Sequence, residues 1–479
     1  MALFSFFAGW ISYLLICLLG LIFITFLCFC LYIKYIHLKY DHIPGPPRDS
    51  FVFGHLTTIQ REMSNDRIVH DKFLEWAETY GPVYRINCMH VVMLFVTCPD
   101  TTKEVLMSPK YPKAPLVYKR LFNLFGQRFL GSGLVTAQNH DEWYKQRRIM
   151  DPAFSSLYLR GQMGAFNERA EKLMDKLADM ADTNTAANMQ HMFDCVTLDV
   201  ITKVTVTSCY PQIPTLHLHF ILHFIKLHLF EYLTILHIQW INERKMAVQN
   251  GEDVPKDILT QILKTAEENI ANDDEELMLD NFVTFFIAGQ ESTANQLAFA
   301  VMELGRLPDI LTKQEVDDVI GMKQEISFDD LGKMTYLSQV LKETLRLYPT
   351  APGTSRFIPN NIVINGIPIP AGVSFVFNSY VCGRLDKFFE DPLKFDPERF
   401  HPDAAKPYYC YYPFSLGPRS CLGQSFAQME AKVVMAKLLQ RFDFSLLPGQ
   451  SFDILDTGSL RPKSGVVCNI RHRGQTPAD

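Results

Sequence analysis

Cys421 is the residue whose surroundings most clearly suggest chemistry. It lies in the turn-rich stretch 414–423, Phe-Ser-Leu-Gly-Pro-Arg-Ser-Cys-Leu-Gly, directly before a long helical pattern. Gly417 and Pro418 predict a tight turn, so that successive backbone N–H groups can face the sulfur. Arg419 and the N-terminus of the following helix add positive potential, which favours the metal-binding thiolate. An isolated cysteine near a helix start is usually an ordinary buried residue. The spacing of phenylalanine, glycines and arginine around this one favours a metal ligand instead.

A second set of reactive groups lies inside the longest helical pattern, residues 277–304, which is apolar nearly all round and therefore predicted to run through the core. In its middle, two small residues precede an acid and two hydroxyls, in the order Ala288, Gly289, Gln290, Glu291, Ser292 and Thr293. Buried polar groups are costly unless a function needs them. The small residues could leave room for a ligand, and the hydroxyls could hold water and transfer protons. The alternative is a packing glycine with internally hydrogen-bonded hydroxyls.

Two pairs of residues have spacings that place both members on one helix face. Trp143 and Arg147 are four residues apart, so both could bind acidic groups of one ligand. A core tryptophan beside a solvated basic face would give the same pattern. Glu343 and Arg346, three residues apart in a predicted helix over 336–346, could form an ion pair. Such pairs are most often surface features.

Taken in order, these stretches resemble the signatures of the cytochrome P-450 monooxygenases, and they extend over most of the chain. The resemblance implies a haem b group whose iron is bound by the Cys421 thiolate. It also implies O2 as co-substrate and electrons that NADPH supplies through NADPH-cytochrome P-450 reductase. Gly423 has no side chain, which would leave space for a flat macrocycle beside the sulfur. The residues that would contact the haem are Trp143, Arg147, Ala288, Gly289, Arg356, Phe414, Arg419 and Gly423.

The same resemblance assigns roles to the acid and the hydroxyls of the long helix. Glu291 would bring protons from solvent, and Ser292 and Thr293 would share their delivery to bound dioxygen. This chain has Ser292 where the family has threonine, and Thr293 follows it. The resemblance also implies a buried ion-pair network in which an unpaired member would be costly. Its members are Glu343, Arg346 and Arg399.

Composition and periodicity limit the fold and the class of function. With 479 residues, 48% hydrophobic, the chain can bury a large core. A net charge of −6 without a basic cluster argues against nucleic-acid binding. Eleven cysteines at irregular spacing indicate a reducing compartment and no structural disulfides. Most segments have helical periodicity, whereas 83–96 predicts a strand hairpin and 354–377 further strands. We therefore predict a mainly α, cytochrome P-450 fold: a large helical haem domain with a small β portion.

The N-terminus predicts a membrane anchor. No charged residue occurs from Leu3 to Ile33, which is long enough to cross a bilayer as a helix. A cleaved signal peptide would have a shorter apolar run with a basic residue before it. Basic residues follow the span and none precedes it, which places the bulk of the chain in the cytosol. We predict a single-pass protein of the endoplasmic reticulum with an anchor at 1–33, a basic, proline-rich linker at 34–50 that holds the globular part off the membrane, and a haem-thiolate monooxygenase domain at 51–479.

Three segments resemble the cholesterol 24-hydroxylase branch of the family: 257–264, 280–289 and 427–441. That resemblance implies a sterol substrate, cholesterol, hydroxylated on its side chain at carbon 24. Another lipid or a xenobiotic stays open as substrate, because the predicted pocket residues are apolar without selecting one lipid. Those residues are Phe122, Phe125, Leu134, Ala288, Ala351 and Pro352.

The resemblance fails over 204–239, where the family has two amphipathic helices that roof the substrate cavity. Here the sequence is shorter and unrelated, and its histidines lie at irregular spacing, which does not favour a metal site. Two hypotheses from different classes follow. The chain is a working sterol monooxygenase, or it is a haem-binding membrane protein that turns over little or not at all because this roof segment is truncated.

Overall fold

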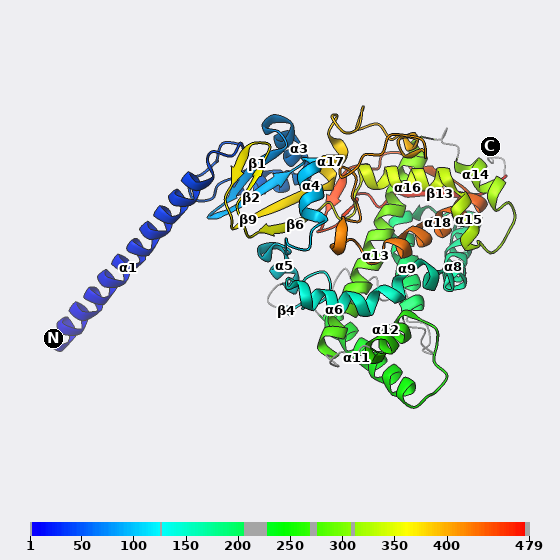
Figure 1. Ribbon diagram of the computed structural model, residues 1–479, viewed down its shortest axis with the longest axis horizontal. Coiled ribbons are helices and arrows are strands. Elements are labelled where there is room, and N and C mark those ends of the chain that lie inside the picture. Colours follow the sequence, from blue (N-terminus) through cyan, green and yellow to red (C-terminus); the bar gives the residue numbers. More distant parts are fainter. Residues whose placement is uncertain (1, 125–126, 206–227, 269–274, 308–311, 475–479) are drawn as a thin grey trace.

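The computed structural model of the chain describes residues 2–124, 127–205, 228–268, 275–307 and 312–474. Figure 1 shows α1 projecting as one long helix from a body in which helices predominate. The first helices are α1 (Ala2–Tyr40), α2 (Leu56–Ser64), α3 (Val69–Tyr80), α4 (Pro99–Leu106), α5 (Pro115–Phe122), α6 (His140–Met150), α7 (Ser156–Arg160), α8 (Met163–Asp182) and α9 (Met189–Thr205). They are followed by α11 (His228–Gln249), α12 (Ile258–Glu268), α13 (Glu275–Arg306), α14 (Thr312–Val319), α15 (Phe328–Lys333), α16 (Thr335–Leu347), α17 (Ser379–Arg384) and α18 (Gln424–Arg441). Short 3-10 helices span Asp151–Phe154, Pro397–Phe400 and Gly417–Arg419.

Helix α13 forms the centre of the body. It packs against α9, α16 and α18, and every residue from Ala294 to Met302 is buried. A helix that is apolar nearly all round has no solvated face and must be surrounded by other elements. The predicted central helix over 277–304 is therefore confirmed, with observed ends at Glu275 and Arg306.

The β portion is small and lies mainly beside the N-terminal helices (Figure 1). Its largest sheet has four strands in the order β1-β2-β9-β6, formed by β1 (Val83–Cys88), β2 (Val91–Val96), β9 (Val373–Asn378) and β6 (Gly353–Ile358). β1 and β2 are the predicted hairpin, and β2 continues the sheet by parallel pairing with β9, Leu94 opposite Phe375. The remaining strands are β3 (Asn123–Leu124), β4 (Gln127–Arg128), β5 (Ala187–Asn188), β7 (Ile362–Ile364), β8 (Ile367–Ile369), β10 (Phe442–Leu446), β11 (Ile454–Asp456), β12 (Leu460–Pro462) and β13 (Val467–His472). The mainly α fold with a small β portion is thus confirmed.

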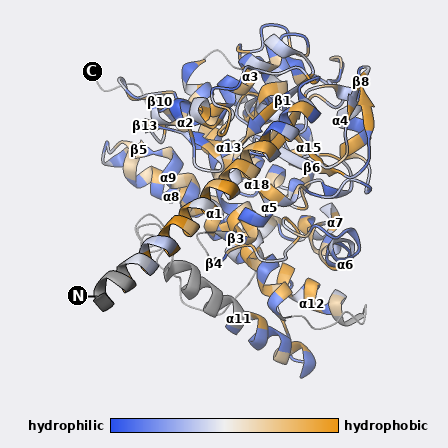
Figure 2. Ribbon diagram, turned by 90° about the vertical axis from the view of Figure 1, so that its left-hand side faces the viewer, coloured by the Kyte–Doolittle hydropathy of each residue, from blue (hydrophilic) through white to orange (hydrophobic). Residues whose placement is uncertain are grey.

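Helix α1 has the length and composition of a membrane span. From Gly9 to Tyr40 its most apolar window has a mean hydropathy of 3.0, and Figure 2 shows it as a mostly hydrophobic helix that leaves the body. The helix continues past the predicted apolar run to Tyr40, and its last turns enter the body, where Ile33 and Tyr40 are buried. The anchor is therefore joined to the body by packing as well as by the chain.

The proline-rich segment after α1 packs against the body. The carbonyl oxygen of Pro44 accepts a hydrogen bond from the Arg85 N–H of β1 at 2.8 Å, and Pro46 O lies 3.0 Å from His55 Nε2. β1 is an edge strand with unpaired backbone groups, and a proline carbonyl can accept from such an edge although proline has no N–H to donate. The segment therefore covers the sheet edge.

A buried ion-pair network joins α16 to the 3-10 helix Pro397–Phe400. Arg346 donates to both oxygens of Glu343 at 2.7 and 2.8 Å, and neither side chain is exposed. Arg399 Nε lies 3.4 Å from Glu343 Oε1, and the Asp396 N–H donates to the same oxygen at 2.8 Å. Arg346 also donates to carbonyls of the following loop, including Pro392 O at 2.7 Å. The structure thus brings together the three residues expected from the sequence.

Replacing Glu343 with alanine should prevent accumulation of folded protein. The change leaves Arg346 buried without its counter-charge, which costs about 3 to 5 kcal/mol. We expect a large loss of soluble, thermally cooperative protein in detergent extracts. Glu398→Ala, which removes an exposed carboxylate in the neighbouring 3-10 helix, is the matched control and should behave like the parent. Normal yield and unfolding temperature for Glu343→Ala would show that the network does not stabilise the fold.

Candidate active site

A cavity of about 410 Å³ lies between α13 and the loop that carries Cys421. The two sets of reactive residues, 414–423 and 288–293, face each other across it. The expected site residues on its wall are Leu134, Trp143, Arg147, Ala288, Gly289, Glu291, Ser292, Thr293, Ala351, Phe414, Arg419, Cys421 and Gly423. Some residues that line this cavity are therefore more than 250 positions apart in the chain, which the sequence alone could not show.

The Cys421 loop has the tight turn expected of it. Gly417 has φ +68°, and a Cβ at this position would lie 2.3 Å from Leu106 O, so only glycine fits. The Cys421 N–H donates to Phe414 O at 2.8 Å, which closes the loop before α18 begins at Gln424. The thiol is accessible although the loop is deep in the protein, because it faces the cavity. A Cβ on Gly423 would lie 3.9 Å from the sulfur, so the space beside the sulfur is open.

Several groups around Cys421 favour its thiolate. Burial raises the pKa of the Cys421 thiol, whereas the Gly423 N–H, Arg147 and Lys113 lower it. Gly423 is the N-cap of α18, so the helix N-terminus contributes as expected. The Arg419 guanidinium lies over the Trp143 ring, 4.1 Å from the centroid.

Arg147 and Arg419 tie α6 to the Cys421 loop. Arg147 donates to Ser420 O at 2.8 Å and forms an ion pair with Asp151, one turn further along the chain. Arg419 Nη1 donates to Ala137 O at 2.8 Å. The expected pair of Trp143 and Arg147 thus lies on the cavity wall, as one face of α6.

Positive charge accumulates on one side of the cavity without matching negative charge. Lys113, Arg356 and Arg419 lie close enough to perturb one another, and burial, reinforced by the two arginines, lowers the pKa of Lys113 to about 8. Burial, reinforced by Arg356, likewise lowers the pKa of Arg419 to about 9. Among the residues that the structure describes, no carboxylate lies within ion-pair distance of these three. Such a cluster fits a bound group with acidic arms.

Arg356 lies just behind the wall. Its Nη1 donates to Thr354 Oγ1 at 2.8 Å, and Thr354 lines the cavity, whereas the buried Nη2 has no hydrogen-bond partner in the described part of the chain. A backbone bridge between Lys113 and Arg356 brings the two cations together. Lys113 could not be found from the sequence, because its loop carries no recognisable pattern and this bridge places it at the site.

On α13, the small residues and the hydroxyls have different environments. Ala288 is exposed to the cavity, and Ser292 Oγ donates to Ala288 O at 2.7 Å. Glu291 accepts a hydrogen bond from Ser459 Oγ at 2.6 Å. A Cβ on Gly289 would lie 3.0 Å from Ile201 Cδ1, so Gly289 permits close packing of α9 on α13. The packing alternative therefore holds for Gly289, although it also touches the cavity.

Thr293 faces a buried acid that the sequence did not bring to attention. Glu430 on α18 is 0% exposed, and neither of its carboxyl oxygens has a hydrogen-bond partner among the described residues. Burial raises its pKa well above the ordinary value, and the Thr293 hydroxyl beside it lowers the pKa only in part. Burial therefore favours the protonated, neutral form of Glu430.

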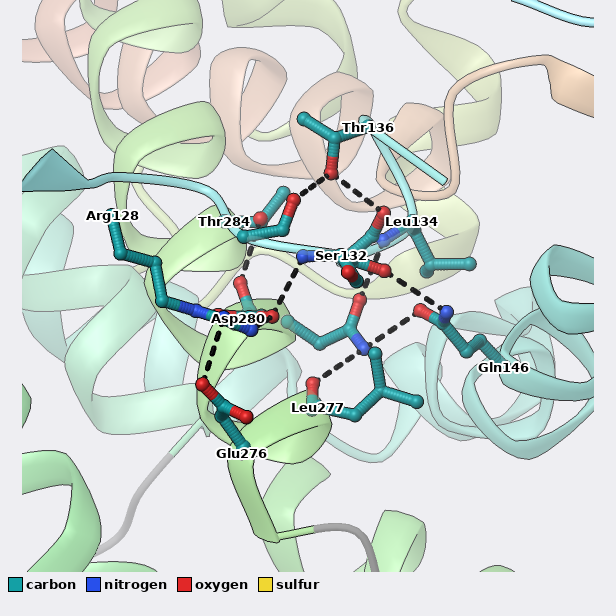
Figure 3. Close-up of polar contacts among 12 residues, drawn as sticks. Arg128, Ser132, Leu134, Thr136, Gln146, Glu276, Leu277, Asp280 and Thr284 are labelled. Carbon is teal, nitrogen blue, oxygen red and sulfur yellow. Dashed lines mark hydrogen bonds and ion pairs between the residues drawn. The ribbon is translucent and has the colours of Figure 1, made fainter. Parts of the chain in front are cut away.

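The loop before α6 is fastened to the start of α13 by a network of polar contacts (Figure 3). Arg128 donates to both oxygens of Asp280 at 2.9 and 2.6 Å, and the Ser132 N–H donates to the same carboxylate at 2.7 Å. Asn281 Oδ1 accepts from the Leu134 N–H at 2.8 Å, and its Nδ2 donates to Gln146 Oε1 at 2.9 Å. These contacts hold Leu134 at the cavity wall.

Only some of the residues expected to contact the substrate lie on the cavity wall. Leu134, Ala288 and Ala351 line the cavity, but Phe122 and Pro352 are not on the wall that the structure describes. Phe122 lies at the end of α5 under the Arg128 guanidinium, 5.2 Å from the ring centroid. The Pro352 carbonyl accepts from the Ser379 N–H at 2.7 Å, which fixes the start of β6 instead. Phe125 lies outside the described residues, as does most of 204–239. The sequence missed several apolar wall residues: Phe154, Ile201, Phe285, Ile287 and Phe426.

The comparison with protein families decides the identity of this site. The family model described as Cytochrome P450 matches residues 44–217 and 210–469. The chain belongs to the cytochrome P450 family. The two matched stretches meet at 210–217, inside the segment where the resemblance fails in sequence.

The chain also aligns with known cytochromes P450 over most of their length. Human cytochrome P450 3A7 is 30% identical over 442 residues, which cover 84% of this chain and 85% of the relative. Rat cytochrome P450 4B1 is 29% identical over 470 residues, with 89% of each chain covered. Cytochrome P450 4d2 of Drosophila melanogaster is 27% identical over 485 residues, covering 90% of this chain and 94% of the relative.

As a cytochrome P450, the chain is a monooxygenase that uses a haem-thiolate iron, O2 and electrons from a reductase. The described residues fit this cofactor. An accessible cysteine sulfur faces the cavity, and the buried Lys113 and Arg356 and the half-buried Arg419 lie beside it without carboxylate partners among the described residues. Cations of this kind can hold the two propionates that a haem carries.

Glu430→Gln should stabilise this P450, and increasingly so as the pH rises. Glu430 has a raised pKa in the folded state, so the folded chain keeps a proton that the unfolded chain releases above about pH 4.3. The free energy of unfolding of the parent therefore falls as the pH rises above about 4.3. Glutamine cannot ionise, so the variant lacks this pH dependence. The gap in unfolding temperature between variant and parent should widen from about pH 5 to about pH 8.

The control for this measurement is Glu390→Gln, which neutralises an exposed carboxylate. Its unfolding temperature should follow that of the parent at each pH. A constant or narrowing gap for Glu430→Gln would mean that Glu430 is ionised in the folded protein.

Proposed function

We propose that this P450 is a membrane-anchored sterol hydroxylase of the cholesterol 24-hydroxylase type. The observation that carries the monooxygenase part is the single cavity in which Cys421 faces the acid and hydroxyls of α13. The sterol part is supported by the resemblance of 257–264, 280–289 and 427–441 to that branch of the family. Cholesterol would be hydroxylated on its side chain, at carbon 24.

In this proposal, the residues of one wall hold the cofactor. Cys421 supplies the thiolate that binds the iron, and Gly423 leaves the space beside the sulfur open. Trp143 and Arg147 take one acidic arm, while the cations around Arg356 take the other. When bound, the haem supplies the activation of O2 that side chains cannot perform.

The residues of α13 supply protons in this proposal. Glu291, Ser292 and Thr293 line the cavity within one turn of the helix. Ser292 already donates to the backbone, at 2.7 Å to Ala288 O, whereas Thr293 Oγ1 has no hydrogen-bond partner in the described part of the chain. Thr293 therefore has the freer hydroxyl, and Glu291 is the ionisable group that can exchange protons with solvent.

A sterol suits the apolar residues of the cavity wall because it is rigid and apolar. Burying such a molecule loses little conformational entropy, and its side-chain end must point at the iron for hydroxylation there. Helix α1 would hold the enzyme on the endoplasmic reticulum as a single-pass protein, at a bilayer into which an apolar sterol partitions. The reductase would dock on the face of α6 that carries the exposed Lys145 and Arg148.

One observation favours a second candidate function, a haem-binding protein with little turnover. The match to the family model divides at 210–217, in the segment where the family has the helices that roof the substrate cavity. A cavity without that roof would admit water, which weakens substrate binding and favours loss of reduced oxygen. The two candidates share the cofactor and differ in whether a sterol stimulates NADPH consumption.

Cys421→Ser should abolish the spectrum that is specific for a thiolate ligand. An alcohol does not ionise at neutral pH, so the ferrous carbon monoxide complex should lose its long-wavelength Soret band. Cys410→Ser is the matched control, because Cys410 is buried near the same loop and does not line the cavity. It should keep the band. A band that survives in Cys421→Ser would disprove the assigned ligand.

The substrate proposal is tested with reductase, NADPH and cholesterol in bilayer vesicles. We expect weak turnover or none from the chain itself, and 24-hydroxycholesterol from a variant in which family-length helices replace 204–239. Mass spectrometry of the products should show the hydroxyl on the side chain, and Cys421→Ser supplies the inactive control. Product from a fatty acid but not from cholesterol would reject the sterol, and NADPH consumption without any product would favour the second candidate.

A further inference from the structure

Outside the residues already assigned, one chain of hydrogen bonds leads from the protein interior to Glu291. Ser459 lies in the turn between β11 and β12 and lines the cavity. Its hydroxyl donates to Glu291 Oε1 at 2.6 Å. The same oxygen, Ser459 Oγ, accepts from Asn295 Nδ2 at 3.1 Å. Asn295 is fully buried on α13, one turn beyond Glu291.

The orientation of each amide in this chain is determined by its neighbours. Gln190 Nε2 on α9 donates to Asn295 Oδ1 at 2.8 Å and to Asp194 Oδ1 at 3.1 Å. A flipped Gln190 would place its oxygen against two other oxygens, which is unfavourable. Asn295 must therefore present its oxygen to Gln190 and its N–H to Ser459.

Ser459 is left with one arrangement of its single proton. Since its oxygen accepts from Asn295, its hydrogen is free to point at Glu291, the acceptor at 2.6 Å. Asp194 stands at the far end of the chain, where it also accepts from Gln290 at 3.1 Å. From Gln190 through Asn295 to Ser459, each group thus donates to the next, toward the carboxylate of Glu291. Gln190 also donates to Asp194, which fixes the start of the chain.

We infer that Ser459 is a positioning residue, which holds the Glu291 carboxylate in one place on the cavity wall through the directed chain from Gln190 and Asn295. The inference rests on the proposed function, because Glu291 is the group to which proton exchange with solvent was assigned. Amide groups do not carry protons along this chain, so its role is to orient Glu291 and not to conduct. Without the Ser459 hydroxyl, Glu291 would sample several rotamers and deliver protons from fewer of them.

The turn itself offers a matched control. Thr457 is exposed in the same turn, and its hydroxyl lies 3.5 Å from Ser459 O without contacting Glu291. Ser459→Ala removes the proposed donor, Ser459→Thr keeps a hydroxyl, and Thr457→Ala removes a hydroxyl of equal chemistry that has no link to Glu291. Folding of all three is checked by their unfolding temperatures.

The first measurement is the amount of product formed per NADPH consumed, with a substrate that the parent enzyme turns over. Ser459→Ala should lower it about fivefold in favour of hydrogen peroxide, the factor expected from one hydrogen bond. Ser459→Thr should restore it, and Thr457→Ala should match the parent. The double variant Ser459→Ala with Glu291→Gln should be no worse than Glu291→Gln alone, because Ser459 acts through Glu291. Additive losses, or equal losses in Ser459→Ala and Thr457→Ala, would overturn the inference.

The second measurement needs no turnover. The C–O stretching band of the ferrous carbon monoxide complex responds to polar groups in the cavity, so one position of Glu291 gives one band. Ser459→Ala should broaden or split this band, and Ser459→Thr should keep it single. An unchanged band in Ser459→Ala would overturn the inference even if the parent proved to be a haem protein without turnover, which keeps this result separate from the test of the proposed function.

Discussion

Lys113, Arg356 and Arg419 hold positive charge beside the cavity with no carboxylate within ion-pair reach among the described residues, and the protein depends on how that charge is neutralised. Removing cations from water without a partner is costly, and a protein of marginal stability does not sustain it for structural reasons alone. A bound group with acidic arms neutralises these cations and so offsets the cost. The same cations hold the group in place. The same cations therefore determine both the binding of the cofactor and the stability of this region. The cations come from a loop, a strand and the cysteine loop, so a bound group would contact all three elements at once.

Helix α13 satisfies two opposing demands. It is the core helix of the body and buries every residue from Ala294 to Met302, yet its middle turn presents an acid and two hydroxyls to the cavity. Ser292 donates to Ala288 O within the helix, whereas the other two polar groups meet neighbours from other elements. Ser459 donates to Glu291, and the Thr293 hydroxyl lies beside the buried Glu430. These two neighbours come from the turn between β11 and β12 and from α18, so the polar turn of α13 depends on the packing of both around it.

The four-stranded sheet connects helix α1 with the active site. One edge, β1, is covered by the proline-rich segment that follows α1, through Pro44 and Arg85. The other edge, β6, is covered by the loop of Lys113, through the bridge to Arg356. An uncovered edge would expose unpaired N–H and C=O groups. Helix α1 and the cation cluster are thus attached to opposite edges of one four-stranded sheet, so the sheet relates the position of α1 to that of the cation cluster.

The sequence by itself determined the local features of this protein. The apolar run of α1, the hairpin β1–β2, the central helix α13 and the turn before Cys421 follow from composition, periodicity and glycine placement, which act over a few residues. The same local signals identified Cys421, the α13 acid and hydroxyls, and Glu343 with Arg346. What only the tertiary structure decided depends on contacts between distant segments. It placed Lys113 beside Arg356, turned Arg419 toward Trp143, gave Gly289 a packing role against Ile201, and brought Ser459 and Glu430 to α13. No pattern along the chain encodes these pairs, because each is produced by the packing of elements whose spacing in sequence is arbitrary.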